Sequence, residues 1–397
     1  QVLGLAAAQL QGDRMLFGVV ADPIRKDLAL SDTQLALASG LFFILFNLIG
    51  GLFIARVIDR GNRVRILACG VVVWSIATAT TGLAHNYVTL SLSRVLVGIG
   101  EATVFPAAMS LIPDLFRPAA RGRAVSIFQS SNFVGIVGGT IIAGILAATH
   151  GWRDMFVICG LAGLVVALLL FVTVSEPARE ASADDRDRQA YWADFRAGMG
   201  RVVSMPGIVP LALALGFALM MGTVMGAWGP AFLLRVHQVP LAEVGLAIGP
   251  PVGLGGIVGT LASGFIVDAL IRRSGDNRSA LLVPIWAVPL ALPFMAGFVF
   301  LPYLGATLAC AAVMNILLSA AVPPVMHFAI NAAKPADRGL ATTFILMVMG
   351  LIGGALGPFI VGAASDLLAP SMGDLALRYA IGMILVTQTG TVDINMG

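Results

Sequence analysis

The sequence predicts an all-α membrane protein with twelve transmembrane helices, arranged as two pseudo-symmetric six-helix bundles. Three observations support this prediction. Hydrophobic residues make up 58% of the 397-residue chain and charged residues 11%, whereas soluble domains have about 45–50% apolar and about 25% charged residues. The apolar residues form runs long enough to cross a bilayer. A charged loop motif in the first half of the chain recurs 217 residues later, which indicates a duplicated unit.

Each run of about 20 mostly apolar residues can cross the ~30 Å hydrocarbon core of a bilayer. The runs of the first half lie at 1–21, 35–58, 66–84, 87–112, 125–148 and 155–174. Those of the second half lie at 208–234, 243–271, 280–301, 304–331 and 340–365. A last apolar piece, from Tyr379 to Val386, is too short to cross the bilayer, so the twelfth span is expected to be incomplete in this chain.

One long hydrophilic segment separates the two sets of runs. We therefore expect an N-terminal six-helix bundle at 1–175, a linker at 176–205 and a C-terminal six-helix bundle at 206–397. The first part of the linker is highly charged and typical of a solvated segment. The aromatic stretch at 191–195 fits either an amphipathic helix at the membrane interface or a continuation of the flexible linker.

Basic residues are distributed unevenly between the loops of this arrangement. The loops after even-numbered spans, together with Arg56 at a span end, hold 17 of the 24 lysines and arginines, and the loops after odd-numbered spans hold five. Positive charges near span ends remain on the cytoplasmic side. The sequence therefore predicts a multi-pass protein of the cell's inner (plasma) membrane, with both termini and the 176–205 linker in the cytoplasm.

The polar residues exclude several kinds of chemistry. The net charge of +3 is small, so no nucleic-acid partner is expected. The three cysteines and four histidines are scattered singly, without the spacing of a metal site or of a disulfide framework. The sequence contains no reactive constellation of the kind that an enzyme needs. We therefore expect no metal, no cofactor and no catalytic site.

The two halves carry matching loops. The stretch 117–124 (RPAARGRA) matches 334–341 (KPADRGLA), and an Asp followed four residues later by an Arg at 55–63 recurs at 264–272. Two parallel six-span repeats are typical of a transporter whose halves rock around a site near the bilayer midplane. The loop charges would then pair with neighbouring helix ends and close a gate, although positive-inside topology alone explains about half of this charge. The candidate gating residues are Asp59, Arg60, Arg63, Arg121, Asp268, Arg272 and Arg338.

Four ionisable residues lie well inside apolar spans, Asp13 and Arg14 in the first span and Arg94 and Glu101 in the fourth. Each costs at least ~2.5–3.5 kcal/mol at a helix centre, so each should face water or a partner. Arg94 and Glu101 lie two turns apart on one helix face.

These positions predict a role for each intramembrane charge. We expect Glu101 to accept a proton, with Arg94 as its electrostatic regulator. Asp13 is the other partner available to Arg94, and Arg14 is expected to bind an anionic headgroup. The alternative is a static buried Asp13–Arg94 pair that only holds two helices in register.

The spans of the second half carry no such charges. They offer apolar and weakly polar side chains, among which we select Met221, Trp228, Asn315 and Phe344 as candidate substrate contacts. Methionine-rich surfaces adapt to irregular apolar ligands, although any one of these residues could equally face lipid or the core. A cavity with charge on one side and pliable apolar surface on the other suits an amphiphile.

Together these features resemble the major facilitator superfamily over essentially the whole chain. The duplicated inner loops carry the resemblance, together with Arg94-xxx-Gly98-x-Gly100 in the fourth span. Within the superfamily the sequence looks most like the Spinster-like branch, as a bacterial-type member. That likeness is based on Asp13-Arg14, on the loop at 59–63 (DRGNR) and on Gly100-Glu101-Ala102. Ala55 departs from the superfamily pattern, whose loop motif begins with Gly, so packing of the gate is expected to differ there.

The resemblance implies the major facilitator fold, alternating access and, for the animal members, export of sphingosine phosphate or lysophospholipids. It also implies proton linkage through Glu101, with Asp13, Arg14 and Arg94 around it. The leading hypothesis is a proton-linked secondary transporter of an amphiphilic, anionic, lipid-like solute, acting as a monomer among membrane lipids. Two alternatives stay open: a facilitator for small organic anions or drugs, and an uncoupled lipid-binding or scrambling protein.

Overall fold

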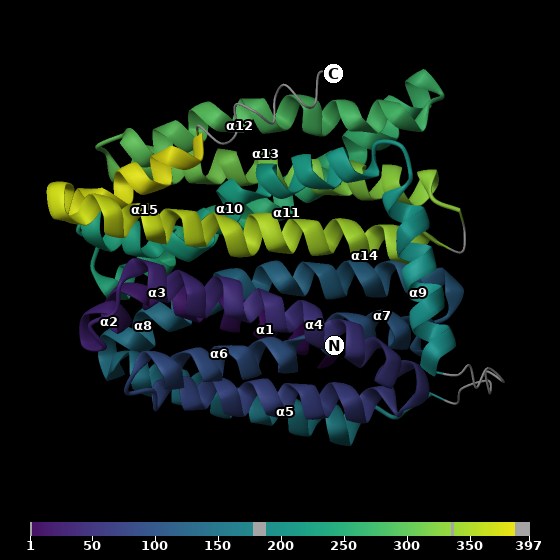
Figure 1. Ribbon diagram of the computed structural model, residues 1–397, viewed down its shortest axis with the longest axis horizontal. Helices are drawn as coiled ribbons and strands as arrows, with labels where there is room; N and C mark the ends of the chain where they lie inside the picture. Colours follow the sequence, from purple (N-terminus) through teal and green to yellow (C-terminus); the bar gives the residue numbers. More distant parts are fainter. Residues whose placement is uncertain (1, 178–187, 335–336, 386–397) are drawn as a thin grey trace.

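The computed structural model describes residues 2–177, 188–334 and 337–385, apart from the side chains at 55–56, 59–60, 118–119, 122, 125 and 188–192 (Figure 1). The first helix group consists of α1 (Val2–Val19), α2 (Ala21–Asp27), α3 (Asp32–Ala36), the π-helical turn η1 (Leu37–Phe42), α4 (Phe43–Arg60), α5 (Arg63–Gly82), α6 (Tyr87–Glu101), α7 (Val104–Leu115) and α8 (Pro118–Thr173). After α9 (Arg188–Val203), the second helix group consists of α10 (Ile208–Val236), α11 (Leu241–Ser274), η2 (Asn277–Leu281), α12 (Leu282–Phe300), α13 (Leu304–Ala332), α14 (Arg338–Met349), the π-helical turn η4 (Gly350–Leu356), α15 (Gly357–Met372), η5 (Gly373–Leu375) and a helical stretch at 376–385.

The described residues confirm the all-α architecture. Nine of their helical stretches are long and apolar enough to cross a membrane, and two of these, Ser126–Thr173 and Arg338–Leu385, have 48 residues each. The first reverses at Gly151, whose φ of +85° glycine adopts without strain, so it contains both predicted spans between 125 and 174. The description of the last helix stops at Leu385, and the incompleteness of the twelfth span stays a prediction.

Side-chain caps set the beginnings of the helices that follow polar loops. The side chain of Asn62 accepts a hydrogen bond from the Arg65 amide at 2.7 Å and begins α5. Asn86 begins α6 in the same way, with the Thr89 amide at 2.9 Å. In hydrocarbon, each backbone polar group must be paired within its own helix, and long apolar runs therefore remain helical beyond these caps.

Glycines bring the helices of each group into backbone contact. A Cβ atom at Gly135 of α8 would lie 1.9 Å from the Ala8 carbonyl oxygen of α1, and one at Gly139 would lie 2.4 Å from the Gly12 Cα. In the second group, a Cβ at Gly259 of α11 would lie 2.1 Å from the carbonyl oxygen of α13 residue Ile316. Helices that have no hydrophobic drive to associate in lipid pack through such small residues.

The two groups lie side by side along their length (Figure 1). The end that carries Arg63, Arg121, Arg272 and Arg338 is named the basic end, and the other is the opposite end. Toward the opposite end, Gly245 and Gly249 of α11 fit against Thr140 of α8. Toward the basic end, no heavy atom lies within 4 Å of a Cβ built at Gly264, which continues the same face of α11. The groups therefore meet toward the opposite end and separate along this seam toward the basic end.

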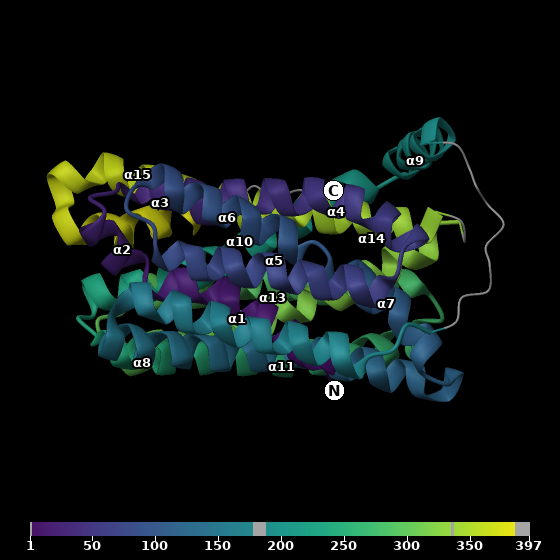
Figure 2. The ribbon, with the colours of Figure 1, turned by 90° about the horizontal axis from the view of Figure 1, so that it is seen from below.

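Helix α9 occupies the predicted linker and lies at the basic end, as both views show (Figures 1 and 2). Its Arg201 forms two hydrogen bonds to the Asp337 carboxylate, at 3.1 and 2.7 Å. The Arg201 hydrogen bond holds the pKa of Asp337 below its ordinary value. Of the two possibilities for the 191–195 segment, the structure has the helix. The most charged part of the linker, at 178–187, lies outside the described residues.

Candidate functional site

The four intramembrane charges lie on two helices of the first group. Asp13 and Arg14 are on α1, and Arg94 and Glu101 are on α6. Arg14 Nε donates a hydrogen bond to Glu101 Oε2 at 2.7 Å. The Glu101 side chain is fully buried, whereas 35% of the Arg14 side chain is exposed. A ligand that enters between the helix groups would therefore meet Arg14 before it meets Glu101.

Arg94 has a different environment from Arg14. It is 2% exposed, and its guanidinium lies over the rings of Phe17 and Phe43, at 5.5 and 5.3 Å from their centroids. Within the described residues its Nε and Nη1 have no hydrogen-bond partner, and no ion pair joins it to Asp13. Each unpaired buried polar atom costs about 1–3 kcal/mol. The static Asp13–Arg94 pair is thus not formed in this conformation.

Asp13 instead lies next to neutral polar side chains. Gln9 and Trp74 are its neighbours, and Ser75 and Thr78 follow on α5. These residues are absent from the set predicted from the sequence. The sequence contains a signal for each of them. Gln9 is a polar residue inside an apolar run, and Ser75 and Thr78 are polar residues about one helical turn apart in another apolar run.

At the basic end, the gating residues whose side chains the structure describes do not meet across the two groups. Arg63 binds Asp114 Oδ2 at 2.5 Å and Glu176 Oε1 at 2.7 Å, and both partners belong to the first half of the chain. Arg121 donates to the Phe116 carbonyl oxygen at 3.3 Å. The exposed residues Asp268, Arg272 and Arg338 have no ion pair among the described side chains, and the side chains of Asp59 and Arg60 lie outside them.

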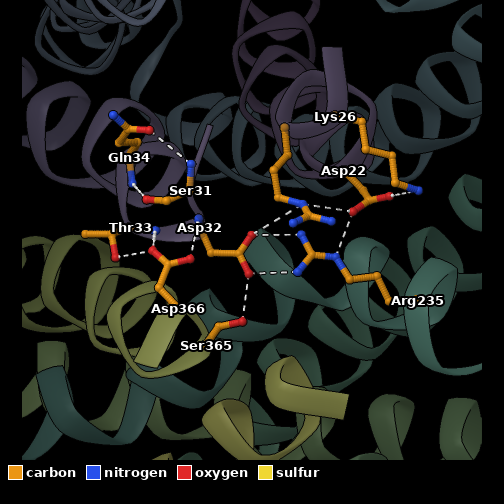
Figure 3. A network of polar contacts seen from close by, with 10 residues as sticks. Asp22, Lys26, Ser31, Asp32, Thr33, Gln34, Arg235, Ser365 and Asp366 are labelled. Carbon is orange, nitrogen blue, oxygen red and sulfur yellow. Dashed lines mark hydrogen bonds and ion pairs between the residues drawn. The ribbon is translucent and has the colours of Figure 1, made fainter. Parts of the chain in front are cut away.

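A buried ionic network joins the two groups at the opposite end (Figure 3). Arg235 of α10 donates from Nε to Asp22 Oδ1 at 2.7 Å. Its Nη1 and Nη2 donate to the two carboxylate oxygens of Asp32, at 2.7 and 2.8 Å. The Ser365 hydroxyl of α15 donates to Asp32 Oδ2 at 2.7 Å. Bidentate arginine–carboxylate pairs of this kind are among the strongest polar contacts in proteins.

The carboxylate of Asp366, also on α15, holds the beginning of α3. Asp366 accepts hydrogen bonds from the amides of Asp32 and Thr33, at 2.9 and 2.8 Å, and from the Thr33 hydroxyl. The first turn of a helix has unpaired amides and a partial positive charge, so a carboxylate is stabilising there. Ser31 caps the same turn with Gln34 in a capping box.

The surroundings of Asp22 favour its ionised form. Burial alone would raise the pKa of Asp22, but the hydrogen bond from Lys26 and the charge of Arg235 hold it below its ordinary value. The network between Arg235, Asp22, Asp32 and Asp366, named the outer clasp, was not predicted from the sequence. The sequence indicates the outer clasp only weakly, through Arg235 near the end of one span and the acids Asp22 and Asp32 in a short loop.

The candidate substrate contacts of the second group are packed inside it. Met221 is fully buried, and Trp228, at 2% exposure, donates its indole N–H to the Pro358 carbonyl oxygen at 3.0 Å. The Asn315 amide donates to the Ala311 carbonyl oxygen at 3.0 Å. Phe344 is 9% exposed. In this conformation these side chains form the second group's core, next to the interface with α1.

Known proteins are similar to this chain in sequence and in fold. The family model of the Major Facilitator Superfamily matches residues 3–358. An MFS-type efflux pump of Mycolicibacterium smegmatis is 29% identical over 97% of this chain and 88% of that protein. Protein spinster homolog 1 of Xenopus laevis is 26% identical over 89% of this chain and 70% of that protein. A probable L-galactonate transporter of Escherichia coli is 28% identical over 66% of this chain and 59% of that protein.

A solved structure is similar over nearly the whole chain. It is the crystal structure of a bacterial homolog to the human lysosomal transporter Spinster, in an inward-facing and unoccupied conformation, with a TM-score of 0.86 and 27% identity over 99% of this chain and 95% of that one. The helix arrangement, the paired loops and the matched family model agree with one another. The chain therefore belongs to the Major Facilitator Superfamily of alternating-access membrane transporters, which are not enzymes, and within it is Spinster-like.

Proposed function

We propose that this protein is a proton-linked transporter of an anionic, amphiphilic, lipid-like solute. The observation that carries the proposal is the contact between Arg14 and Glu101. Glu101 Oε2 accepts the Arg14 hydrogen bond, whereas the buried Glu101 Oε1 has no partner among the described residues and is free to take a proton. Protonation at Oε1 removes the charge that holds Arg14.

The freed guanidinium can then bind a phosphate or carboxylate in a bidentate manner. An anionic headgroup and the Glu101 carboxylate therefore compete for Arg14, and binding of the anion is linked to uptake of a proton at Glu101. The rings of Phe17 and Phe43 surround the two arginines with apolar surface. Charge beside aromatic surface suits an amphiphile, and the similarity to protein spinster homolog 1 supports a lipid-like solute.

We further propose that the two helix groups are the moving halves, 1–175 and 206–397, and that the basic end is cytoplasmic. Basic residues concentrate at that end, as expected for cytoplasmic loops. The separation at Gly264 and the outer clasp at the other end then correspond to a cavity that opens to the cytoplasm. Both termini and the 176–205 linker lie on that side, and the protein functions as a monomer in the plasma membrane.

The test of proton linkage is uptake into proteoliposomes under an imposed pH gradient, with a lysophospholipid as the solute. Glu101→Gln removes the proton acceptor, so gradient-driven uptake should fall about tenfold or more. The matched control is Glu243→Gln, at an exposed acid in the first turn of α11, which should leave uptake unchanged. Full gradient-driven uptake by Glu101→Gln would exclude the proposed proton acceptor.

A second candidate function is transport of small organic anions. It is favoured by the similarity to the probable L-galactonate transporter and by the ability of Arg14 to bind any carboxylate. Competition by lysophospholipids of increasing tail length separates the two functions. A lipid carrier should bind longer tails more tightly, by about 0.8 kcal/mol for each buried CH₂ group, whereas a small-anion carrier should be insensitive to the tail. Uptake of lipid that ignores the pH gradient in the unmodified protein would instead indicate an uncoupled scramblase.

A further inference from the structure

One aromatic ring lies against both intramembrane arginines. The guanidinium carbon of Arg14 lies 5.2 Å from the centroid of the Phe43 ring, and that of Arg94 lies 5.3 Å from the same centroid. Phe43 is 6% exposed, so both cations meet its ring in an apolar environment. The face of an aromatic ring is negatively charged and attracts a cation, most strongly where water is excluded. The two arginines therefore share one attractive partner.

Backbone contacts hold Phe43 in this place. It begins α4, and its carbonyl oxygen would lie 2.5 Å from a Cβ atom built at Gly98 of α6. Gly98 follows Arg94 by one turn on the same face of α6. The Asn47 side-chain amide, one turn further along α4, donates to the Gly98 carbonyl oxygen at 3.0 Å. The glycine lets α4 approach α6 closely enough for the Phe43 ring to reach Arg94.

Arg94 is attracted by two carboxylates but is paired with neither. Glu101 acts on it most strongly, followed by Asp13. Within the described residues no ion pair joins Arg94 to either carboxylate, and its Nε and Nη1 have no hydrogen-bond partner. The rings of Phe43 and Phe17 are the attractive contacts that the structure shows for this guanidinium. They hold it where it does not reach a carboxylate.

We propose that Phe43 is a positioning residue that holds Arg94 away from Glu101, so that Arg14 is the partner of this carboxylate. The proposal rests on the proposed function, in which proton uptake at Glu101 releases Arg14 to an anion. If Arg94 reached Glu101, it would take the place of Arg14, and the anion could then bind without a proton. The Phe43 ring therefore makes the release of Arg14 depend on protonation of Glu101.

Chemical modification of Arg14 tests the proposal without a transported solute. Phenylglyoxal, which reacts with arginine, is added to the full-length protein in detergent, and the rate at Arg14 is followed by mass spectrometry of its peptide. Arg14 bound to Glu101 should react slowly, and Glu101→Gln gives the rate of the released side chain. Phe43→Leu should raise the rate about tenfold or more, because Arg94 loses a ring and binds Glu101 in place of Arg14. Phe43→Tyr retains the aromatic face and should react like the unmodified protein.

Two further proteins separate this role from simple shielding of Arg14 by the ring. Phe43→Leu combined with Arg94→Gln removes the competing guanidinium, so Arg14 should return to Glu101 and react slowly again. If the ring merely shielded Arg14 from the reagent, this double variant would react as fast as Phe43→Leu. A trifluorinated phenylalanine in place of Phe43 keeps the shape of the ring and weakens the negative charge of its face. It should raise the rate as Phe43→Leu does, and it tests the proposal even if the leucine variant does not fold.

The matched control is Phe128→Leu in α8. Phe128 is similarly buried, at 4% exposure, and no arginine among the described side chains lies over its ring. This variant should leave the rate at Arg14 unchanged. An unchanged rate in the fluorinated protein, a fast reaction in the double variant, or an equal increase in Phe128→Leu would overturn the proposal.

The modification result is distinguishable from the uptake result. Slow reaction of Arg14 in Glu101→Gln would refute the Arg14–Glu101 contact and the proposed function with it. Fast reaction in Glu101→Gln with an unchanged rate in the fluorinated protein would reject the role of Phe43 alone. Fast reaction in Phe43→Leu that the double variant reverses, together with full gradient-driven uptake by Glu101→Gln, would support the positioning role and reject the proton-linked function.

Discussion

Each intramembrane charge has a role that depends on its immediate partner. The sequence predicts which residues are charged within the spans, because a single Asp or Arg is conspicuous in an apolar run. It does not predict that Arg14, rather than Arg94, contacts Glu101. Spacing along one helix fixes which residues share a face, but a contact between α1 and α6 depends on how the two helices are rotated about their axes.

Single glycines set the distance between helices, and this gives a prediction at the residue scale. Gly135→Ala should lower the melting temperature, since its Cβ would lie 1.9 Å from the Ala8 carbonyl oxygen and overpacking costs about 1–3 kcal/mol. Gly138→Ala, three residues further on, has no heavy atom within 4 Å and should be neutral or slightly stabilising. Thermal unfolding in detergent measures both. Equal shifts in the two variants would contradict the packing argument.

The sequence predicts the membrane-spanning helices well, because their apolar runs show in its hydropathy. The apolar runs correspond to the spans, because hydrocarbon leaves an apolar segment no alternative to the helix. The π-helical turns η1 and η4 were not predicted. They face each other across the two groups, where a Cβ at Gly40 would lie 3.5 Å from the Gly354 carbonyl oxygen. Such irregular turns depend on contacts between segments more than three hundred residues apart, which periodicity does not encode.

Helix α9 gives a prediction at the element scale. Asp337→Asn should release α9 from the second group, because Arg201 would lose the carboxylate that it binds twice. Hydrogen–deuterium exchange of the α9 amides should then become faster. Asp268→Asn, at an exposed acid of the same end, is the control and should leave this exchange unchanged.

Lower pH should have the same effect on α9. The pKa of Asp337 is lowered by Arg201, so the contact stabilises the docked helix above the ordinary pKa of an Asp. This stabilisation is lost as the pH falls below that value and through the lowered pKa. Protection of α9 that stays constant over this acidic range would show that another contact holds it.

The molecule as a whole is closed at the opposite end and separated at the basic end. No sequence pattern predicts this, because one sequence must encode every conformation of a transport cycle. Among the described side chains, the loop charges predicted to close the basic end do not pair across the two groups, whereas the clasp residues, which the sequence did not single out, are paired.

The outer clasp gives the prediction for the whole molecule. Arg235→Gln removes the buried cation that binds both Asp22 and Asp32 and leaves only the more exposed Arg25 and Lys26 beside them. Removing one partner of a buried ion pair costs about 3–5 kcal/mol. The opposite end should open, and the distance between spin labels at His85 and Ser371 should lengthen in a cysteine-free background. Arg153→Gln is the control, since Arg153 pairs with Asp27 within the first group. An unchanged distance distribution in Arg235→Gln would refute the clasp.

Because Arg235 is almost dry while it touches both aspartates, water must reach all three groups before any of them can leave. In a partly opened state, at least one of the three charged groups would be buried without an ion-pair partner and without water. The opposite end should therefore switch abruptly between shut and open, with openings that are rare and brief, rather than widen gradually as a solute moves through it.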